Sequence, residues 1–180
     1  MSRFFNAALL AATVLITGCA ATVQQSANND SKLVLPAAGS KKIVMLVQGS
    51  DVAARSSDWE LLRTEWRRAM LSAASAAGLD FTYQEYAIRP GTGTGPGTAV
   101  VVKVNDYRYI SPGARFGLGI FTGNAFIDAD VQFVDLQTGR AAGSRKYATS
   151  SSAMQGVFSA MTDKQIQAIC TQIVKDVTQR

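Results

Sequence analysis

The chain has 180 residues, of which 47% are hydrophobic, and its 18 basic and 13 acidic residues give a formal net charge of +5. The basic residues are scattered and do not alternate with aromatic ones, which argues against binding to nucleic acid. Because the chain contains no histidine, it lacks the usual general base, the Ser-His-Asp and Cys-His arrangements, and the commonest zinc ligand. This composition predicts no catalytic residues, no metal site and no enzymatic activity.

The first 18 residues have the features of an export signal. Arg3 supplies one positive charge, and an apolar run from Ala7 to Ile16 follows it. This run is far shorter than the ~20 residues that a membrane-spanning helix requires. We therefore expect residues 1–18 to be removed, which lowers the formal net charge to +4 and leaves enough chain for one domain with a single core.

The signal ends in Ile16-Thr17-Gly18-Cys19, and this order of residues resembles the lipobox of bacterial lipoproteins. The resemblance implies signal cleavage between Gly18 and Cys19, a diacylglycerol on the Cys19 thiol, and a further acyl chain such as palmitate on the new amino terminus. Two or more acyl chains hold a protein firmly on a bilayer, whereas one holds it only marginally. The alternative is an ordinary secretory signal in which Cys19 merely lies near the cleavage site.

Ala20 follows the modified cysteine. An aspartate at this position favours inner-membrane retention in Gram-negative lipoproteins, so Ala20 favours the inner leaflet of the outer membrane, facing the periplasm. Residues 19–40 are rich in small and amide side chains, which bury too little apolar surface to offset the entropy lost on ordering. We therefore expect a flexible tether over residues 19–40, which lets a single domain over residues 41–180 stand off from the membrane.

The domain is predicted to begin with a buried strand over the apolar run 43–47. A helix should follow, because Ser57 and Glu60 have the spacing of a capping box and Gly78 is placed to end the helix. Apolar residues recur between them at helical spacing (Trp59, Leu62, Trp66, Ala69, Met70 and Ala73). The arginines of this segment lie mostly off the apolar stripe and are expected to be solvated (Arg63, Arg67 and Arg68).

Four more strands are predicted from their apolar patterns, over residues 79–87, 99–110, 124–136 and 140–149. A tight turn over residues 135–139 joins the last two strands. The final helix should open at a second capping box, Thr162 to Gln165. Cys170 lies on the apolar face of this helix, where a small buried hydrophobe is a better interpretation than a reactive thiol or an intermolecular disulfide.

This order, strand, helix, four strands and helix, predicts an α/β (α+β) domain with a mixed sheet of about five strands and two main helices packed largely on one face. The strand over 100–106, the glycine-rich link over 113–123 and the strand ending over 134–139 look like parts of the small α/β lipoproteins of bacterial envelopes, which are known mostly as domains of unknown function. The resemblance covers about residues 41–178. It implies a fold and a location, and it brings no catalytic residues and no cofactor other than the lipid on Cys19.

Residues 111–125 combine four glycines with large apolar side chains, namely Phe116, Leu118, Ile120 and Phe121. One interpretation is an exposed apolar hairpin tip that contacts a partner, another copy of the chain or the membrane. The other interpretation is that the two flanking strands run further and fold these side chains onto the core.

A rival site is the loop Gln48–Asp51, because loops at the carboxyl ends of strands often carry ligands. Without a histidine, Ser50 would need an unusual base such as Lys41 or Lys42, so a plain turn from strand to helix is the simpler interpretation.

Two further patterns invite a ligand and are better explained without one. The glycine-rich segment 90–97 is followed by a strand, whereas a phosphate-binding loop needs a helix. The acids Asp128, Asp130 and Asp135 form an alternating set that might suggest calcium. However, Asp128 and Asp130 share one strand face without the glycine-bearing loop of a calcium site, and they are expected on the solvated face of the strand.

The sequence thus predicts a lipid-anchored envelope lipoprotein that acts without catalysis. Its partners would be membrane lipid, through Cys19, and an envelope protein or a second copy of the chain, in envelope assembly, secretion or maintenance. The alternative is a small-ligand-binding or enzymatic periplasmic domain that uses the Gln48–Asp51 loop.

Overall fold

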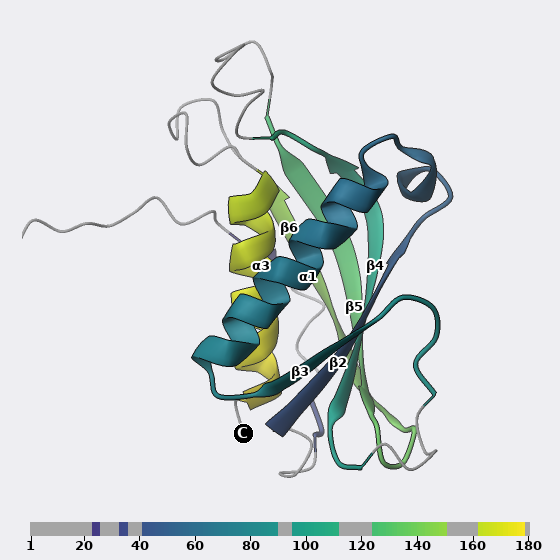
Figure 1. Cartoon of the computed structure of the whole chain (residues 1–180), viewed down its shortest axis with the longest axis vertical. Helices are drawn as coiled ribbons and strands as arrows, with labels where there is room; N and C mark the ends of the chain where they lie inside the picture. Colours follow the sequence, from purple (N-terminus) through teal and green to yellow (C-terminus); the bar gives the residue numbers. More distant parts are fainter. Residues whose placement is uncertain are drawn as a thin grey trace, which may run out of the picture.

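The computed structural model describes residues 23–25, 33–35, 41–89, 95–111, 124–150 and 162–178. Within these ranges the chain forms one six-stranded sheet with two helices against it (Figure 1). The strands are β1 (Val23–Gln25), β2 (Lys42–Gly49), β3 (Asp80–Gln84), β4 (Thr98–Arg108), β5 (Phe126–Asp135) and β6 (Ala141–Ser150). The helices are α1 (Trp59–Ala76) and α3 (Thr162–Thr178), and a short 3-10 helix, η3 (Ala53–Arg55), precedes α1.

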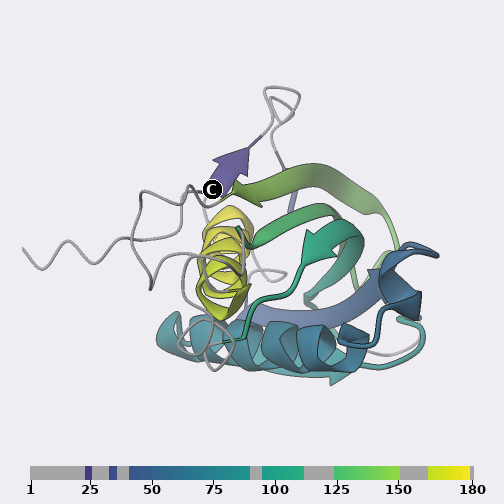
Figure 2. The ribbon, with the colours of Figure 1, turned by 90° about the horizontal axis from the view of Figure 1, so that it is seen from above.

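The sheet is mixed, with the strand order β1-β6-β5-β4-β2-β3. Strand β2 pairs in parallel with both β3 and β4, and the other pairs are antiparallel. A parallel neighbour requires a long crossover, which α1 supplies between β2 and β3. Both helices lie on the same side of the curved sheet (Figure 2). The predicted class, element order and mixed strand direction are confirmed.

Strand β1 is an addition that the sequence did not predict. It belongs to the segment expected to be a tether, and it pairs with β6 so that Val23 lies opposite Thr149. Further along, the Val34 amide donates a 3.1 Å hydrogen bond to the Ala142 carbonyl of the same strand. Val23, Leu33 and Leu35 pack against the main core. Strand β1 and Val34 extend the edge of the sheet because β6 supplies backbone hydrogen-bond partners for them. The composition of residues 19–40 does not predict this pairing.

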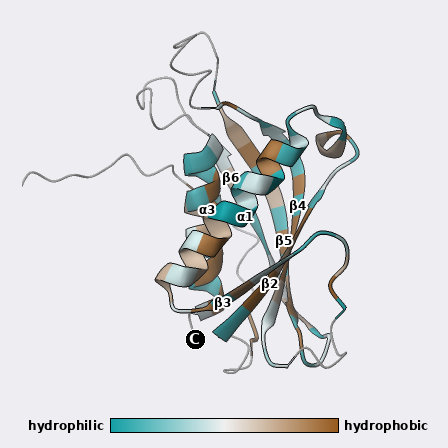
Figure 3. Ribbon diagram, viewed as in Figure 1, coloured by the Kyte–Doolittle hydropathy of each residue, from teal (hydrophilic) through white to brown (hydrophobic). Residues whose placement is uncertain are grey.

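The main core lies between the helices and the inner face of the sheet. Its largest fully buried side chains come from both helices and from strands β2, β5 and β6 (Trp66, Leu62, Met70, Ile166, Ile169, Ile173, Ile43, Met45, Ile127, Phe133 and Tyr147). Figure 3 shows hydrophilic and hydrophobic residues intermixed along the strands and both helices, as expected when each element buries one side only. Cys170 is also fully buried and free, and burial raises the pKa of its thiol. Its predicted role as a buried hydrophobe is confirmed.

Helix α1 begins differently from the prediction. Its N-cap is Asp58, which makes no side-chain capping bond, and Ser57 is exposed. Glu60 reaches forward to Arg63, at 3.1 Å, instead of back to the helix start. The predicted capping box is therefore wrong, because the N-cap is Asp58 and the Glu60 carboxylate is paired with Arg63. Gly78, at φ +68°, does end the helix, and the Leu79 amide bonds to the Ala74 carbonyl.

Two of the three arginines predicted to be solvated contact edge strand β3. The Arg63 Nε donates a 3.2 Å hydrogen bond to the Tyr83 hydroxyl, and the Arg67 guanidinium lies 5.9 Å from the centre of the Tyr83 ring. Arg68 is exposed and pairs with Glu65, one turn earlier. Tyr83 therefore ties α1 to the edge of the sheet.

The turn between β5 and β6 forms as predicted. The Asp135 amide donates to the Arg140 carbonyl, and the Gly139 amide donates to the Asp135 carbonyl. Gly139 has φ +71°, which favours glycine. The Asp135 carboxylate accepts the Gln137 amide at 2.8 Å and is only 7% exposed. Asp135 is thus a turn-forming residue, as expected from its position in the predicted turn over residues 135–139.

Two adjacent leucines of α1 give a matched test of this packing. Leu62 is fully buried and Leu61 is 57% exposed. Leu62→Ala should lower the free energy of unfolding by about 2–5 kcal/mol because it leaves a cavity in the core. Leu61→Ala should change it by no more than about 0.5 kcal/mol. Denaturant titration of both variants measures the difference, and equal losses would contradict this orientation of the helix.

Candidate functional site

The loop Gln48–Asp51 lies at the end of the sheet that we call the upper end. This end is formed by the carboxyl ends of β2, β4 and β6 and the amino ends of β1 and β5, which the strand pairing brings together, and it is at the top of Figure 1. Helix α1 and helix α3 both begin here. The candidate loop Gln48–Asp51 therefore lies at the same end of the sheet as the starts of both helices.

Ser50 has four hydrogen-bonding contacts that fold the chain from β2 into η3. Its hydroxyl donates to the Asn105 carbonyl at 2.8 Å and accepts the Ala53 amide at 3.1 Å. Its backbone amide and carbonyl bond to Val104 and Ala54, both at 2.9 Å. The strand register shifts between Val104 and Asp106, and this irregularity turns the Asn105 carbonyl into a partner for Ser50. Ser50 thus occupies the expected strand-to-helix turn.

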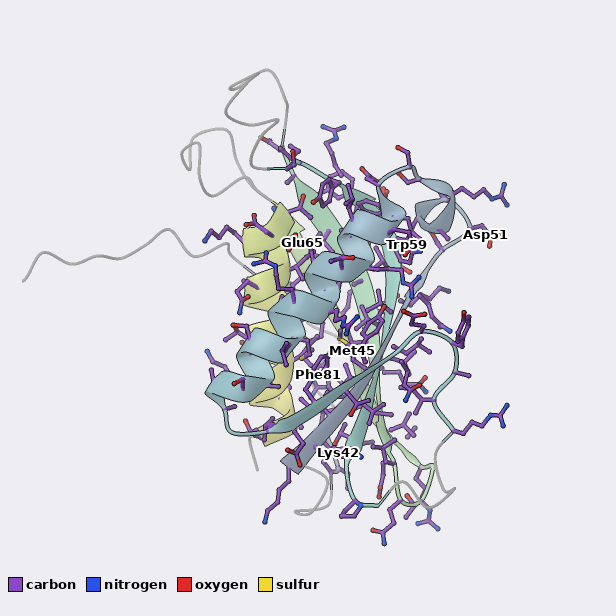
Figure 4. All side chains as sticks on the ribbon, viewed as in Figure 1. Lys42, Met45, Asp51, Trp59, Glu65 and Phe81 are labelled. Atoms are coloured by element: carbon purple, nitrogen blue, oxygen red, sulfur yellow. The ribbon has the colours of Figure 1, made fainter. Side chains whose placement is uncertain are left out.

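Gly49 is required at this turn because no side chain fits. A Cβ placed on Gly49 would lie 2.9 Å from the Ala54 backbone nitrogen and 3.0 Å from the Trp59 ring. Asp51, next to Ser50, is exposed and points away from the rest of the fold (Figure 4). The two side chains that the sequence analysis grouped as a possible ligand site therefore do not converge on a common point.

A second group of side chains locks the start of α1 onto β4. Asp58 Oδ1 accepts hydrogen bonds from the Tyr107 hydroxyl and the Ser56 hydroxyl, both at 2.6 Å. The Tyr107 and Trp59 rings lie 6.3 Å apart at a tilt of 44°. Burial, followed by the hydrogen bond to Asp58, raises the pKa of Tyr107 to about 12. Local sequence patterns do not predict this network, because Asp58 and Tyr107 lie 49 residues apart along the chain.

Helix α3 is joined to the upper end by residues that the sequence assigned to a capping box. The Thr162 hydroxyl accepts the Ile110 amide at 2.8 Å, and Gln165 Nε2 donates to the Ala125 carbonyl at 2.8 Å. Both side chains are buried. They bond to the ends of β4 and β5 instead of to each other, so the second capping box is also wrong. The same two residues instead fix the helix on the sheet.

The surface of the described residues includes hollows between the helices and on the outer face of the sheet. One, of about 290 Å³, lies between the carboxyl-terminal halves of the helices and is lined largely by small residues, among them Ala73, Ala76 and Ala77. The other, of about 250 Å³, lies on the outer face of the sheet between Lys42, Ile88 and Arg89. Neither lies at the Gln48–Asp51 loop.

The outer face of the sheet carries polar pairs near the upper end. Asn105 Nδ2 donates to Asp130 at 2.7 Å, and Lys146 lies 3.1 Å from Asp128. Asp130 is exposed and Asp128 is half-buried, so these two acids occupy the open strand face that the sequence predicted. No cluster of three or more potential metal ligands occurs within the described ranges.

Several predicted site residues lie outside the described residues. They are the signal-cleavage and lipid-attachment residues Gly18 and Cys19, and the possible contact hairpin, Phe116, Leu118, Ile120 and Phe121. The chain leaves β4 at Ser111 and re-enters the described part at Asn124. In the part of the chain that is described, no helix is both long and apolar enough to cross a bilayer.

The fold is similar to that of solved bacterial proteins. A PelC dodecamer from Paraburkholderia phytofirmans matches with a TM-score of 0.55 at 12% identity, covering 89% of this chain and 99% of that one. A single-residue variant of the same PelC dodecamer matches with a TM-score of 0.50 at 13% identity over 89% and 98% of the two chains. Lipoprotein GNA1162 from Neisseria meningitidis is more distant, with a TM-score of 0.38 at 14% identity over 73% and 96%. No protein-family model matches the sequence, and no curated protein matches it either.

A comparison of Ser50 with Ser57 tests the structural role of Ser50. Ser50→Ala removes two hydrogen bonds and leaves the Asn105 carbonyl and the Ala53 amide without that partner, so it should lower the free energy of unfolding by about 1–3 kcal/mol. Ser57→Ala, at an exposed position without a capping role, should change it by no more than about 0.5 kcal/mol. Thermal or denaturant unfolding compares the two variants. If Ser57→Ala lowers the free energy of unfolding as much as Ser50→Ala does, Ser57 caps the helix and this interpretation is contradicted.

The raised pKa of Tyr107 predicts a loss of stability at high pH. The folded phenol keeps its proton up to about pH 12, whereas the unfolded one ionises near its ordinary pKa of 10. The contribution of Tyr107 is therefore fully present below pH 10 and is lost as the pH rises toward 12. Burial raises the pKa of Tyr109 and Tyr147 as well, so Tyr107→Phe should reduce this alkaline loss without abolishing it.

Unfolding measured at a series of pH values tests the prediction, with Tyr86→Phe as the control because Tyr86 is 85% exposed. An alkaline loss in Tyr107→Phe equal to that of the unmodified chain would contradict it.

Proposed function

We propose that this protein is a bacterial envelope lipoprotein, held to the membrane by acyl chains on Cys19, that acts by contact with other proteins. The lipid attachment rests on Ile16-Thr17-Gly18-Cys19 and on the charged and apolar residues before it. We place the domain on the periplasmic side of the outer membrane because Ala20 follows the cysteine. The protein needs no cofactor beyond the covalent lipid.

The observation that carries the contact function is the similarity to the PelC fold over 89% of this chain and 99% of that one. That protein is a dodecamer, and we propose that this chain also assembles with copies of itself. The polar side chains at the upper end support contact over catalysis, because Ser50, Asp58, Thr162 and Gln165 are each bonded to neighbouring backbone or side-chain atoms. A protein partner would therefore contact the outer surface of the domain.

The alternative is a small-ligand-binding or enzymatic domain that uses the Gln48–Asp51 loop. It has less support, because Ser50 is committed to the turn and Asp51 points away from it. Lys42 begins β2 and Ser50 follows its last residue, so an eight-residue strand separates this candidate base from the hydroxyl. A strand of that length spans about 26 Å, far beyond proton-transfer distance.

The two cysteines give a matched test of the anchor. In bacteria supplied with labelled fatty acid, the unmodified chain and Cys170→Ala should both incorporate label, because Cys170 is buried in the core. Cys19→Ser should incorporate none, since serine lacks the nucleophilic thiol, and should accumulate as the uncleaved precursor.

The detergent-solubilised, acylated protein should then have the mass of a homo-oligomer by sedimentation. Label in Cys19→Ser equal to that in the unmodified chain would refute the lipid anchor. A monomer at all concentrations would refute self-assembly.

A further inference from the structure

We propose that the upper end of the sheet lies directly against the phospholipid headgroups of the membrane that holds the anchor. This inference rests on the lipid attachment at Cys19 proposed above. It replaces the long flexible tether of the sequence analysis with a short one, because β1 begins at Val23.

The length of chain available sets the distance. Ala20, Ala21 and Thr22 are the only residues between Cys19 and β1. Consecutive residues of a fully extended chain advance by at most about 3.6 Å, so Val23 lies within about 14 Å of the acylated residue. Strand β4, with 11 residues, spans about 36 Å from the lower to the upper end of the sheet. The tether is therefore much shorter than the domain is tall.

The direction of β1 decides which end of the domain is held close. Val23 lies opposite Thr149, next to the carboxyl end of β6, and Gln25 lies opposite Tyr147, further down that strand. The chain therefore enters the sheet at the upper end and runs toward the lower end. Val34 then bonds to Ala142, near the other end of β6. Two separate contacts thus hold this segment along the edge, and the residues joined to the lipid leave from the top.

The side chains at the upper end suit a headgroup surface. Val52 is 79% exposed there, on the turn that follows β2. Arg55, at the end of η3, and Lys164, in the first turn of α3, are exposed. The Arg108 guanidinium lies 5.9 Å from the centre of the Phe126 ring. A cation beside apolar surface matches the boundary between phosphate groups and acyl chains.

Exposed acids also lie at or near this end, among them Asp51, Glu60, Asp106 and Asp130. With both signs present, net charge alone does not draw this end to the bilayer. The covalent anchor and its short connection hold it there, so the approach should persist at high salt, which screens exposed charges.

Fluorescence energy transfer to the membrane surface tests the proposal. The full-length acylated protein, in a Cys170→Ala background, is reconstituted into phosphatidylcholine vesicles that contain a headgroup-labelled acceptor lipid. A donor dye is placed at Val52→Cys, at the upper end, or at Gln137→Cys, in the exposed turn between β5 and β6 at the lower end. Transfer should be markedly more efficient from position 52 than from position 137, at low and at high salt.

Two insertions of the same length provide the matched control. About ten Gly-Ser residues inserted between Ala21 and Thr22 lengthen the connection before β1, and transfer from position 52 should fall toward that from position 137. The same residues inserted between Asn28 and Asn29 come after β1, and transfer should stay at its original value.

Each result decides the matter. Equal transfer from positions 52 and 137 in the acylated protein overturns the orientation. Transfer from position 52 that survives the insertion before β1 overturns the short connection as its cause. Mass spectrometry of the amino-terminal peptide is read first, because a chain without acyl groups refutes the anchor itself and not the geometry.

Discussion

Two helices and one face of a mixed sheet share a single apolar layer, and the positions of the other elements depend on it. Trp66 and Leu62 of α1, and Ile166 and Ile169 of α3, are fully buried in this layer. Helix α1 carries the chain from β2 to a parallel partner, so its packing also fixes the edge strand β3. The loops of the upper end are thereby attached to a rigid frame. Polar contacts such as the hydrogen bond between Asp58 and Tyr107 fix the position of the start of α1 on β4. Burial of apolar side chains supplies most of the stability of the fold.

At the upper end of the sheet, side chains of chemically reactive types form structural hydrogen bonds. Ser50, Asp58 and Tyr107 are residues that many active sites use, and here each is bonded to a neighbouring turn or helix. A serine whose hydroxyl both donates to a carbonyl and accepts an amide has no geometry left for activation by a base. These contacts therefore fix the shape of the surface at the upper end.

The sequence predicted the features that local pattern determines. The apolar runs around Val100 and Val131 predicted β4 and β5, and Gly78 and Gly139 marked a helix end and a turn, as the structure confirms. It failed where distant partners compete. Thr162 and Gln165 have ideal capping spacing, yet they bond to an amide and a carbonyl that lie 52 and 40 residues away. Strand β1 escaped prediction for the same reason, since β6 provides its hydrogen bonds and its own residues give no signal.

The segment along β6 also protects the sheet. Val23–Gln25 and Val34 occupy backbone positions on the outer edge of a ten-residue strand. An unpaired edge of that length is a template for further strands and promotes aggregation. A shortened chain that begins at residue 41 would keep the apolar layer but leave this edge bare. Val23–Gln25 and Val34 therefore also cover backbone positions that would otherwise be open to nonspecific strand addition.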